Sequence, residues 1–212
     1  MMLFLTHKPH KIFSTLIFLI SSGCIFSTVA NAENMLVDAN ILYTIPDAGG
    51  SDNFHTGKIL SLNYNYYALP WLAVTSGLFL SEEIADNPST DIVGTFQARI
   101  ETSGFTVGLR PEYAFSKRNK IYGRAGILVY KTKLTVDEYF APGLISGSTS
   151  DTANGNGFII ALGWAHSFTQ KVSLQIELKT QQQLDLFDGK TSADNVFDIS
   201  YSGFSLGLGY AF

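Results

Sequence analysis

Ser205-Leu-Gly-Leu-Gly-Tyr-Ala-Phe212 is the stretch that decides the fold of this chain. Large apolar residues alternate along it with small ones: Leu206, Leu208, Tyr210 and Phe212 against Ser205, Gly207, Gly209 and Ala211. On a β-strand a period of two places the large set on one face and the small set on the other. A bulky apolar face and a bare face suit a strand with lipid outside it and a crowded interior behind it. The stretch therefore predicts a membrane-spanning β-strand.

The same stretch resembles the C-terminal signal by which bacterial outer-membrane barrels are recognised for insertion. The residues that carry the resemblance are Ser205, Gly207, Tyr210 and Phe212. The resemblance implies that the barrel-assembly machinery of the outer membrane is a partner of this chain.

The N-terminal residues have the pattern of a secretory signal peptide. Lys8 and Lys11 precede an apolar run at residues 12–20, and the small residues Ala30 and Ala32 occupy the two positions that signal peptidase reads. We expect cleavage after residue 32, which leaves residues 33–212 as one barrel domain. A transmembrane anchor is the alternative, and the cleavage site and the lack of a flanking charge cluster disfavour it. A lipoprotein signal ending at Cys24 is also disfavoured, because Ser21 stands where such signals have leucine.

The composition of residues 33–212 favours an all-β membrane protein. Cys24 leaves with the signal, so no disulfide, thiolate metal site or cysteine nucleophile is expected. Tyr and Phe together number 26 in the whole chain, and no segment after the signal is long enough for a spanning helix. Cofactors and bound metals are not expected, because no two histidines share a ligand spacing and no phosphate-binding glycine loop is present.

Alternating hydrophobicity predicts eight strands, at about residues 35–45, 57–67, 71–82, 95–115, 120–133, 157–168, 171–183 and 200–212. The connections alternate between short turns, at 68–70, 116–119 and 169–170, and long loops, at 46–56, 83–94, 134–156 and 184–199. Short turns on one side and long loops on the other are typical of transmembrane barrels. We therefore predict an all-β fold, an eight-stranded antiparallel transmembrane up-and-down β-barrel with both termini on the short-turn side.

The two faces of the predicted strands indicate which side meets lipid. One strand carries Leu60, Leu62, Tyr64 and Tyr66 on one face and Ser61, Asn63 and Asn65 on the other. A soluble lipocalin-like barrel would turn its apolar face inward. The complementary faces here carry too many amides and charges for an apolar ligand cavity, so we expect a polar interior and an apolar exterior.

Residues 104–126, GFTVGLRPEYAFSKRNKIYGRAG, resemble the fourth and fifth strands of the OmpA-like transmembrane domain. The C-terminal segment and the order of the loops match this family too, so the resemblance covers nearly all of the chain after the signal. Large OmpA proteins carry a periplasmic peptidoglycan-binding domain after the barrel. This sequence ends with the eighth strand, so the resemblance implies the barrel only, without a cell-wall tether.

Charged residues are predicted inside the barrel. By alternation the inward set contains Arg110, Glu112, Arg124, Glu177 and Lys179. Charges confined in so narrow a barrel must pair, because each unpaired one costs several kcal/mol. Two interpretations follow: a salt-bridged plug that holds the barrel rigid, which we favour, or a gated pore, which the family resemblance implies for some members.

Catalysis is not expected, although the small-barrel resemblance includes lipid A-modifying enzymes. His166 and Ser167 are adjacent, but neighbours on one strand point to opposite faces. His166 also falls at the short-turn end of its strand, and His55 has no evident orienting partner in its loop. We expect a non-enzymatic protein.

Charge is distributed unevenly between the two ends of the predicted barrel. Without Lys8 and Lys11, 12 of the 14 Lys and Arg remain against 18 Asp and Glu, a formal charge of −6. Lys190 is the single base in the predicted long loops, against 12 acids: Asp47, Asp52, Glu83, Asp86, Asp91, Asp137, Glu138, Asp151, Asp185, Asp188, Asp194 and Asp198. Bases lie in or beside the short turns, at Lys117, Arg118, Lys120 and Lys171. Acidic loops disfavour nucleic acid and heparin-like polyanions as partners.

The sequence thus predicts a small integral protein of the cell outer membrane with a structural, envelope-stabilising role. An adhesin or host-surface-binding barrel is one alternative, and a narrow porin is another. The expected partners are outer-membrane lipid and lipopolysaccharide besides the assembly machinery, and the expected state is a monomer.

Overall fold

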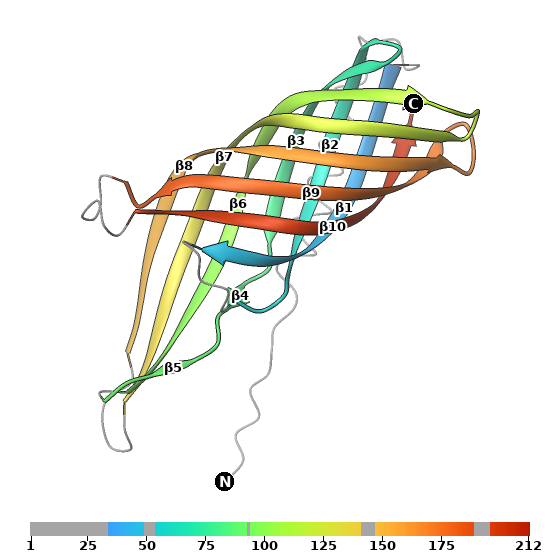
Figure 1. Cartoon of the computed structure of the whole chain (residues 1–212). Coiled ribbons are helices and arrows are strands. Elements are labelled where there is room, and N and C mark those ends of the chain that lie inside the picture. Colours follow the sequence, from blue (N-terminus) through green and yellow to red (C-terminus); the bar gives the residue numbers. More distant parts are fainter. Residues whose placement is uncertain (1–33, 49–53, 93, 141–146, 189–195) are drawn as a thin grey trace. The chain divides into compact units, whose positions relative to one another are not determined.

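The computed structural model describes residues 34–48, 54–92, 94–140, 147–188 and 196–212. Its strands form one compact unit, Met35–Phe212. Figure 1 shows the strands β1 Met35–Ala48, β2 Gly57–Leu69, β3 Leu72–Ser81, β4 Ile84–Ala85, β5 Ser89–Thr90, β6 Gly94–Ala114, β7 Asn119–Phe140, β8 Gly147–Ser167, β9 Val172–Leu186 and β10 Phe197–Ala211. No helix among these residues is long and apolar enough to cross a membrane. The predicted signal peptide, residues 1–32, lies outside the described residues and stays a prediction.

Eight long strands close into an antiparallel ring. Each long strand pairs with the long strands before and after it in the sequence, and β1 pairs with β10 to close the ring. The short strands β4 and β5 come between β3 and β6 in the sequence, but β3 pairs directly with β6. The predicted eight-stranded up-and-down barrel is therefore confirmed.

The paired residues also define the stagger of the ring. Stepping from partner to partner once around it from Asp38 returns to β1 at Ala48, ten residues further along, by way of Asn63, Gly77, Thr106, Leu128, Gly157, Gln183 and Ile199. A stagger of this size tilts the strands against the barrel axis, and an eight-stranded ring leaves an interior that side chains fill.

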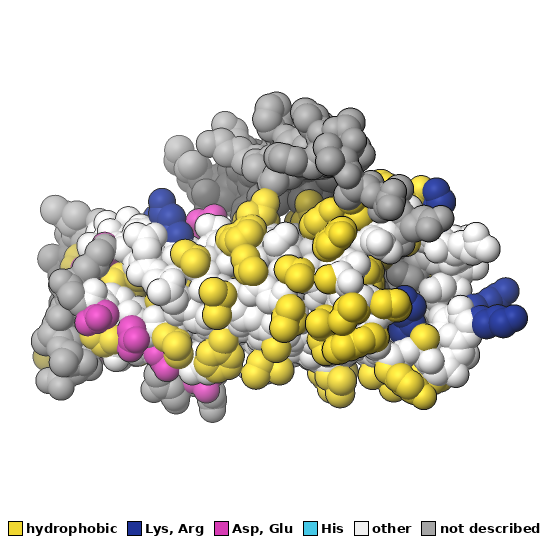
Figure 2. Space-filling model, turned by 90° about the horizontal axis from the view of Figure 1, so that it is seen from above, with side chains coloured by type: hydrophobic (Ala, Val, Ile, Leu, Met, Phe, Trp, Pro, Cys, Tyr) yellow, Lys and Arg dark blue, Asp and Glu magenta, His cyan; other side chains and the backbone are white. Residues whose placement is uncertain are grey.

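Burial alternates along the strands as the sequence predicts. On β10, Ser205, Gly207 and Gly209 are buried, whereas Leu206 and Leu208 are exposed. Exposed large hydrophobic residues surround the ring, among them Ile41, Tyr64, Val74, Phe105, Leu109, Ile127, Ile160, Leu162, Leu178 and Phe204. Figure 2 shows one face of the molecule, where hydrophobic side chains spread over most of the surface and acidic side chains lie toward one end. This apolar belt is the surface that faces lipid.

Strands β6, β7 and β8 continue well past the others, and the predicted loop at 134–156 is wrong for most of its length. Residues 134–140 and 147–156 are paired strands, with Thr135 opposite Ser150 and Gly94 opposite Phe140. We name residues 94–103, 131–140 and 147–156 the extension. Alternation predicts its residues 95–103 and 131–133 as strand but not residues 134–140 and 147–156, because these last segments lie beyond the membrane and neither of their faces needs to be continuously apolar. Six acids that the sequence assigned to loops lie in strands: Asp47, Asp137, Glu138, Asp151, Asp185 and Asp198.

The interior has two layers, and the expected polar lumen is right for only one of them. Toward the loop ends of the strands the buried side chains form an apolar cluster: Leu42, Ile59, Phe79, Ile84, Ile100, Leu128, Tyr130, Ala153, Leu186, Phe187, Ile199 and Tyr201. Phe187 enters this cluster from the β9–β10 connection with a φ of 66°, and its ring centroid lies 6.0 Å from that of Phe197. A positive φ is unfavourable for a bulky residue, so burial of the aromatic ring offsets a backbone cost. Toward the turn ends, the interior is charged.

Candidate functional site: a buried charge network

Asp38 on β1 is the centre of the charged layer. Its side chain is fully buried, and Oδ2 lies 3.0 Å from Nη1 of Arg110 on β6 and 3.3 Å from Nη2 of Arg124 on β7. One carboxylate therefore joins three strands. In a medium with little water these attractions are poorly screened, so the three side chains constrain one another strongly.

Amide side chains complete the coordination of this carboxylate. Asn63 donates a hydrogen bond to Asp38 Oδ1, and Asn65 donates one to Oδ2, each at 2.7 Å. Asn40, two residues along β1, also donates to Oδ1. Hydrogen bonds to an ionised acceptor are stronger than neutral ones, so the amides hold the carboxylate in position and offset its loss of hydration.

A second branch of the network leads toward the short turns. Glu112 Oε1 lies 2.9 Å from Nε of Arg110 and accepts a hydrogen bond from the hydroxyl of Tyr67 at 2.5 Å. Its Oε2 accepts a bond from Nζ of Lys120 at 3.0 Å. The Lys120 side chain is 42% exposed, so the network reaches solvent at this end of the barrel.

A third branch crosses to β9. Arg124 Nη2 lies 3.3 Å from Glu177 Oε1, which also accepts a hydrogen bond from the hydroxyl of Tyr122 at 3.0 Å. The same hydroxyl lies 3.2 Å from Oε1 of Gln175. The guanidinium of Arg110 stacks on the Tyr122 ring at 3.9 Å from its centroid. A cation over an aromatic face is attracted by the ring quadrupole, so Tyr122 links both arginines to Glu177.

The buried charges of the described residues balance in number. Three are acidic, Asp38, Glu112 and Glu177, and three are basic, Arg110, Arg124 and Lys179. Lys179 Nζ lies 3.5 Å from the hydroxyl of Ser61 on β2. A neutral sum keeps six desolvated charges compatible with folding, since each would be costly alone.

All five charges predicted for the interior are buried, four of them in this network and Lys179 beside Ser61, but the centre of the network was missed. Asp38 did have a signal in the sequence. Ala39, Ile41 and Tyr43 lie outward on β1, so alternation turns Asp38 inward. The geometry brings it between Arg110 and Arg124, although Asp38 lies 72 and 86 residues away from them in the sequence.

The residues of the predicted insertion signal lie on both faces of β10. Ser205 and Gly207 are buried, whereas Tyr210 and Phe212 are exposed, with ring centroids 5.0 Å apart. The amide of Phe212 donates a hydrogen bond to the carbonyl oxygen of Met35, 3.0 Å away. Their role in insertion stays a prediction.

The two histidines that follow the signal lie apart from the charged network. The ring of His166 contacts those of Trp164 and Phe168, with centroid distances of 5.8 and 5.3 Å, and its Nδ1 lies 2.9 Å from Asn119 Oδ1. The His55 side chain is exposed on the β1–β2 connection. Within the ranges that the structure describes, no group of three or more His, Cys, Asp or Glu side chains could hold a metal ion.

Two ion pairs fasten the extension on its β4 side. Arg99 Nη1 lies 2.7 Å from Glu83 Oε1, and Nη2 lies 2.6 Å from Asp137 Oδ2. The hydrogen bond that Arg99 donates to Glu83 raises the pKa of its guanidinium, which is charged at every physiological pH. Arg99 therefore ties the β3–β6 connection to β7.

A closed antiparallel ring, an apolar outer belt and a buried charge-balanced interior define a transmembrane β-barrel protein. The family model of the outer membrane protein beta-barrel domain matches residues 16–212, and the chain belongs to this family. It is therefore an outer-membrane protein, and both the resemblance to small outer-membrane barrels and the predicted location are confirmed.

Several solved structures are similar to this chain at low sequence identity, and one of them aligns with a TM-score above 0.5. The outer membrane protease OmpT from Escherichia coli aligns with a TM-score of 0.53 and 10% identity, over 88% of this chain and 99% of OmpT. Ail, the attachment invasion locus protein of Yersinia pestis, aligns at 0.49 and 12%, over 85% and 99% of the two chains. Neisserial surface protein A aligns at 0.49 and 13%, over 84% and 97%. No curated protein matches the sequence.

Proposed function

We propose that this protein is a non-enzymatic structural component of the outer membrane that stabilises the envelope. The observation that carries the proposal is the interior network centred on Asp38. Its charges pair across β1, β6, β7 and β9, and an apolar cluster fills the interior on the loop side. Paired charges and packed apolar side chains inside the barrel hold its strands in fixed positions, so the barrel is expected to be rigid.

The same interior supports a plug rather than a pore. A solute that passed through the barrel would have to separate Arg110 and Arg124 from Asp38 and then displace the apolar cluster, including Leu42 and Phe187. Separating buried ion pairs leaves desolvated charges and costs several kcal/mol. Purified barrel in planar bilayers is expected to give no steady single-channel current, and a stable open state would count against the plug.

The structural role is tested with a deletion strain. Loss of the protein is expected to increase sensitivity to detergents and EDTA without changing the uptake of small solutes. Complementation with the wild-type gene should restore resistance. Normal detergent resistance in the deletion strain, together with reduced solute uptake, would favour the narrow porin instead.

A surface-binding role is a second candidate, and the extension favours it. β6, β7 and β8 carry residues such as Tyr139, which is exposed, far beyond the apolar belt. An adhesin of this kind should make a non-adherent strain bind host cells. The described acidic side chains Asp86, Asp91 and Asp188 disfavour heparin-like partners, so added heparin is not expected to compete. Adhesion that heparin abolishes would contradict the charge argument.

The remaining partner assignments belong to the same proposal. Insertion by the barrel-assembly machinery, a monomeric state and no binding of nucleic acid are expected. Sedimentation of the detergent-solubilised protein tests the monomer, and a gel-shift assay tests nucleic-acid binding.

A further inference from the structure

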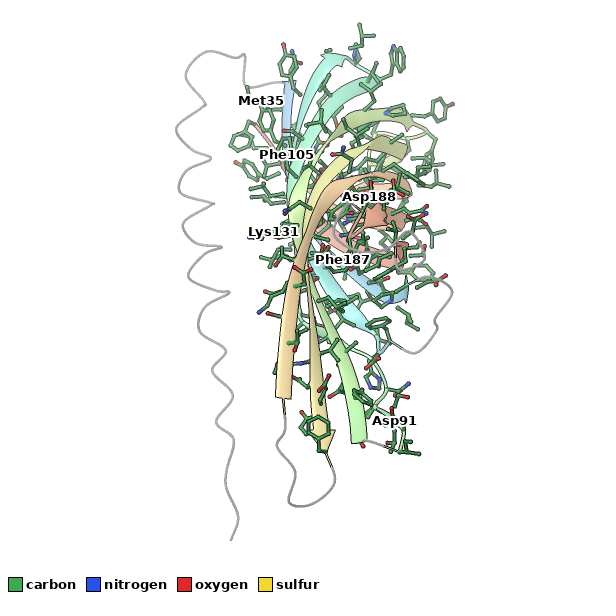
Figure 3. All side chains as sticks on the ribbon, turned by 90° about the vertical axis from the view of Figure 1, so that its left-hand side faces the viewer. Met35, Asp91, Phe105, Lys131, Phe187 and Asp188 are labelled. Carbon is green, nitrogen blue, oxygen red and sulfur yellow. The ribbon has the colours of Figure 1, made fainter. Side chains whose placement is uncertain are left out.

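The outward face of β6, β7 and β8 changes character where the apolar belt ends. Phe105 on β6 and Val129 on β7 are paired neighbours and are both exposed. The next outward residues along β7 are Lys131 and Lys133, also exposed. Figure 3 shows Lys131 beyond Phe105 on the path from Met35 toward Asp91 in the β5–β6 connection.

The position of these lysines relative to the membrane follows from strand geometry. Lys131 is two residues beyond Val129, about 6–7 Å further along the strand, and Lys133 is as far again. With a strand tilt of about 40°, each step of two residues rises about 5 Å along the membrane normal. The ammonium groups therefore lie at the height of the lipid head groups on the loop side of the barrel.

Lys58 and Arg99, two other cations that the structure describes at this end of the barrel, are already paired. Lys58 lies 4.0 Å from Glu82, and Arg99 bridges two carboxylates on neighbouring elements. Lys131 and Lys133 form no ion pair with any residue that the structure describes. They are therefore the cations available to an external anion on this face.

The neighbours of the two lysines suit a sugar phosphate. Lys131 lies between Ser103 on β6 and Asn154 on β8, which are its register partners and are both exposed. Glu101 lies opposite Lys133 and is the acid of this patch. Hydroxyl and amide groups beside a cation can donate hydrogen bonds to phosphate and accept them from sugar hydroxyls.

We infer that Lys131 and Lys133 bind the phosphate groups of the outer-leaflet glycolipid, lipopolysaccharide. This inference rests on the proposed structural role, because a barrel that stabilises the envelope would do so by binding the glycolipid that surrounds the barrel. The acyl chains would pack on Phe105 and Val129, while the phosphates meet the two ammonium groups directly above them. A soluble polyanion would use only the lysines, whereas a phosphorylated glycolipid uses both parts of this face.

The test measures binding of purified lipopolysaccharide to the whole barrel in detergent micelles. Each basic side chain at an anionic membrane surface contributes about a factor of five to binding, so K131A/K133A should weaken the apparent Kd about 25-fold. The matched control is K117A/R118A, which removes two charges from the short turn at the other end and should leave the Kd unchanged. K131R/K133R keeps the charge and should keep the affinity.

The second arm uses lipopolysaccharide whose phosphates have been removed, which should bind the wild type about as weakly as intact lipid binds K131A/K133A. The inference would be overturned if K131A/K133A and K117A/R118A bound lipopolysaccharide equally well. It would also be overturned if the wild type bound dephosphorylated and intact lipopolysaccharide with the same affinity. The folded, heat-modifiable gel band identifies folded protein in every sample. Binding in micelles does not depend on envelope integrity, so this result stands apart from the deletion-strain test.

Discussion

Replacing Asp38 with alanine is expected to destabilise the barrel more than removal of any exposed acid, because the change leaves two buried cations without their shared partner. The side chains of Asp38, Arg110 and Arg124 are 0%, 1% and 2% exposed, so water does not screen them. Removing one member of a buried ion pair costs about 3–5 kcal/mol. The amide donors Asn63 and Asn65 also lose their acceptor.

Urea unfolding in phospholipid vesicles measures this effect. With a urea dependence of about 1–3 kcal/mol per molar, a loss of 3 kcal/mol lowers the midpoint by at least about 1 M. The matched control is Glu101→Ala, which removes an exposed acid of β6 and should shift the midpoint very little. Equal midpoints for the two variants would refute the conclusion that Asp38 is the energetic centre of the network.

Two further predictions test packing and assembly. Gly163→Ala should destabilise the barrel by about 1–3 kcal/mol, because a Cβ there would overlap the Tyr122 ring, whereas Gly123→Ala meets only ordinary contacts at 3.6 and 3.8 Å and should unfold like the wild type; similar urea midpoints would contradict this. Changing both Tyr210 and Phe212 to alanine should leave the protein in the periplasm as a protease-sensitive form, and normal amounts of heat-modifiable protein in the outer membrane would disprove their role in insertion.

The strand pattern was readable from the sequence because lipid imposes a local rule. Every second residue of a spanning strand must be apolar, so Leu206, Leu208 and Tyr210 reveal the outward face of β10 without knowledge of its neighbours. The same rule assigned Arg110 and Glu177 to the interior. It also located the short turns, since a barrel strand has to reverse where the apolar belt ends.

The rule fails where lipid is absent. Residues 134–140 and 147–156 have water rather than lipid on their outer side, so their pairing left no alternation to read. The apolar layer around Leu42 was missed for a related reason. Alternation tells which face a residue takes but does not tell what fills the interior at that height.

The local pattern of the chain thus determined the membrane-spanning barrel, its faces and the presence of charges inside it. Only the tertiary structure decided which charges meet. Asp38 joins Arg110 and Arg124 because ring closure and a stagger of ten residues bring β1, β6 and β7 to one level. The inferred position of Lys131 at head-group height also depends on the tertiary structure, because the pairing of neighbouring strands determines where the apolar belt ends. Pairing across a closed ring is set by the sum of its registers, which no single strand carries in its own sequence.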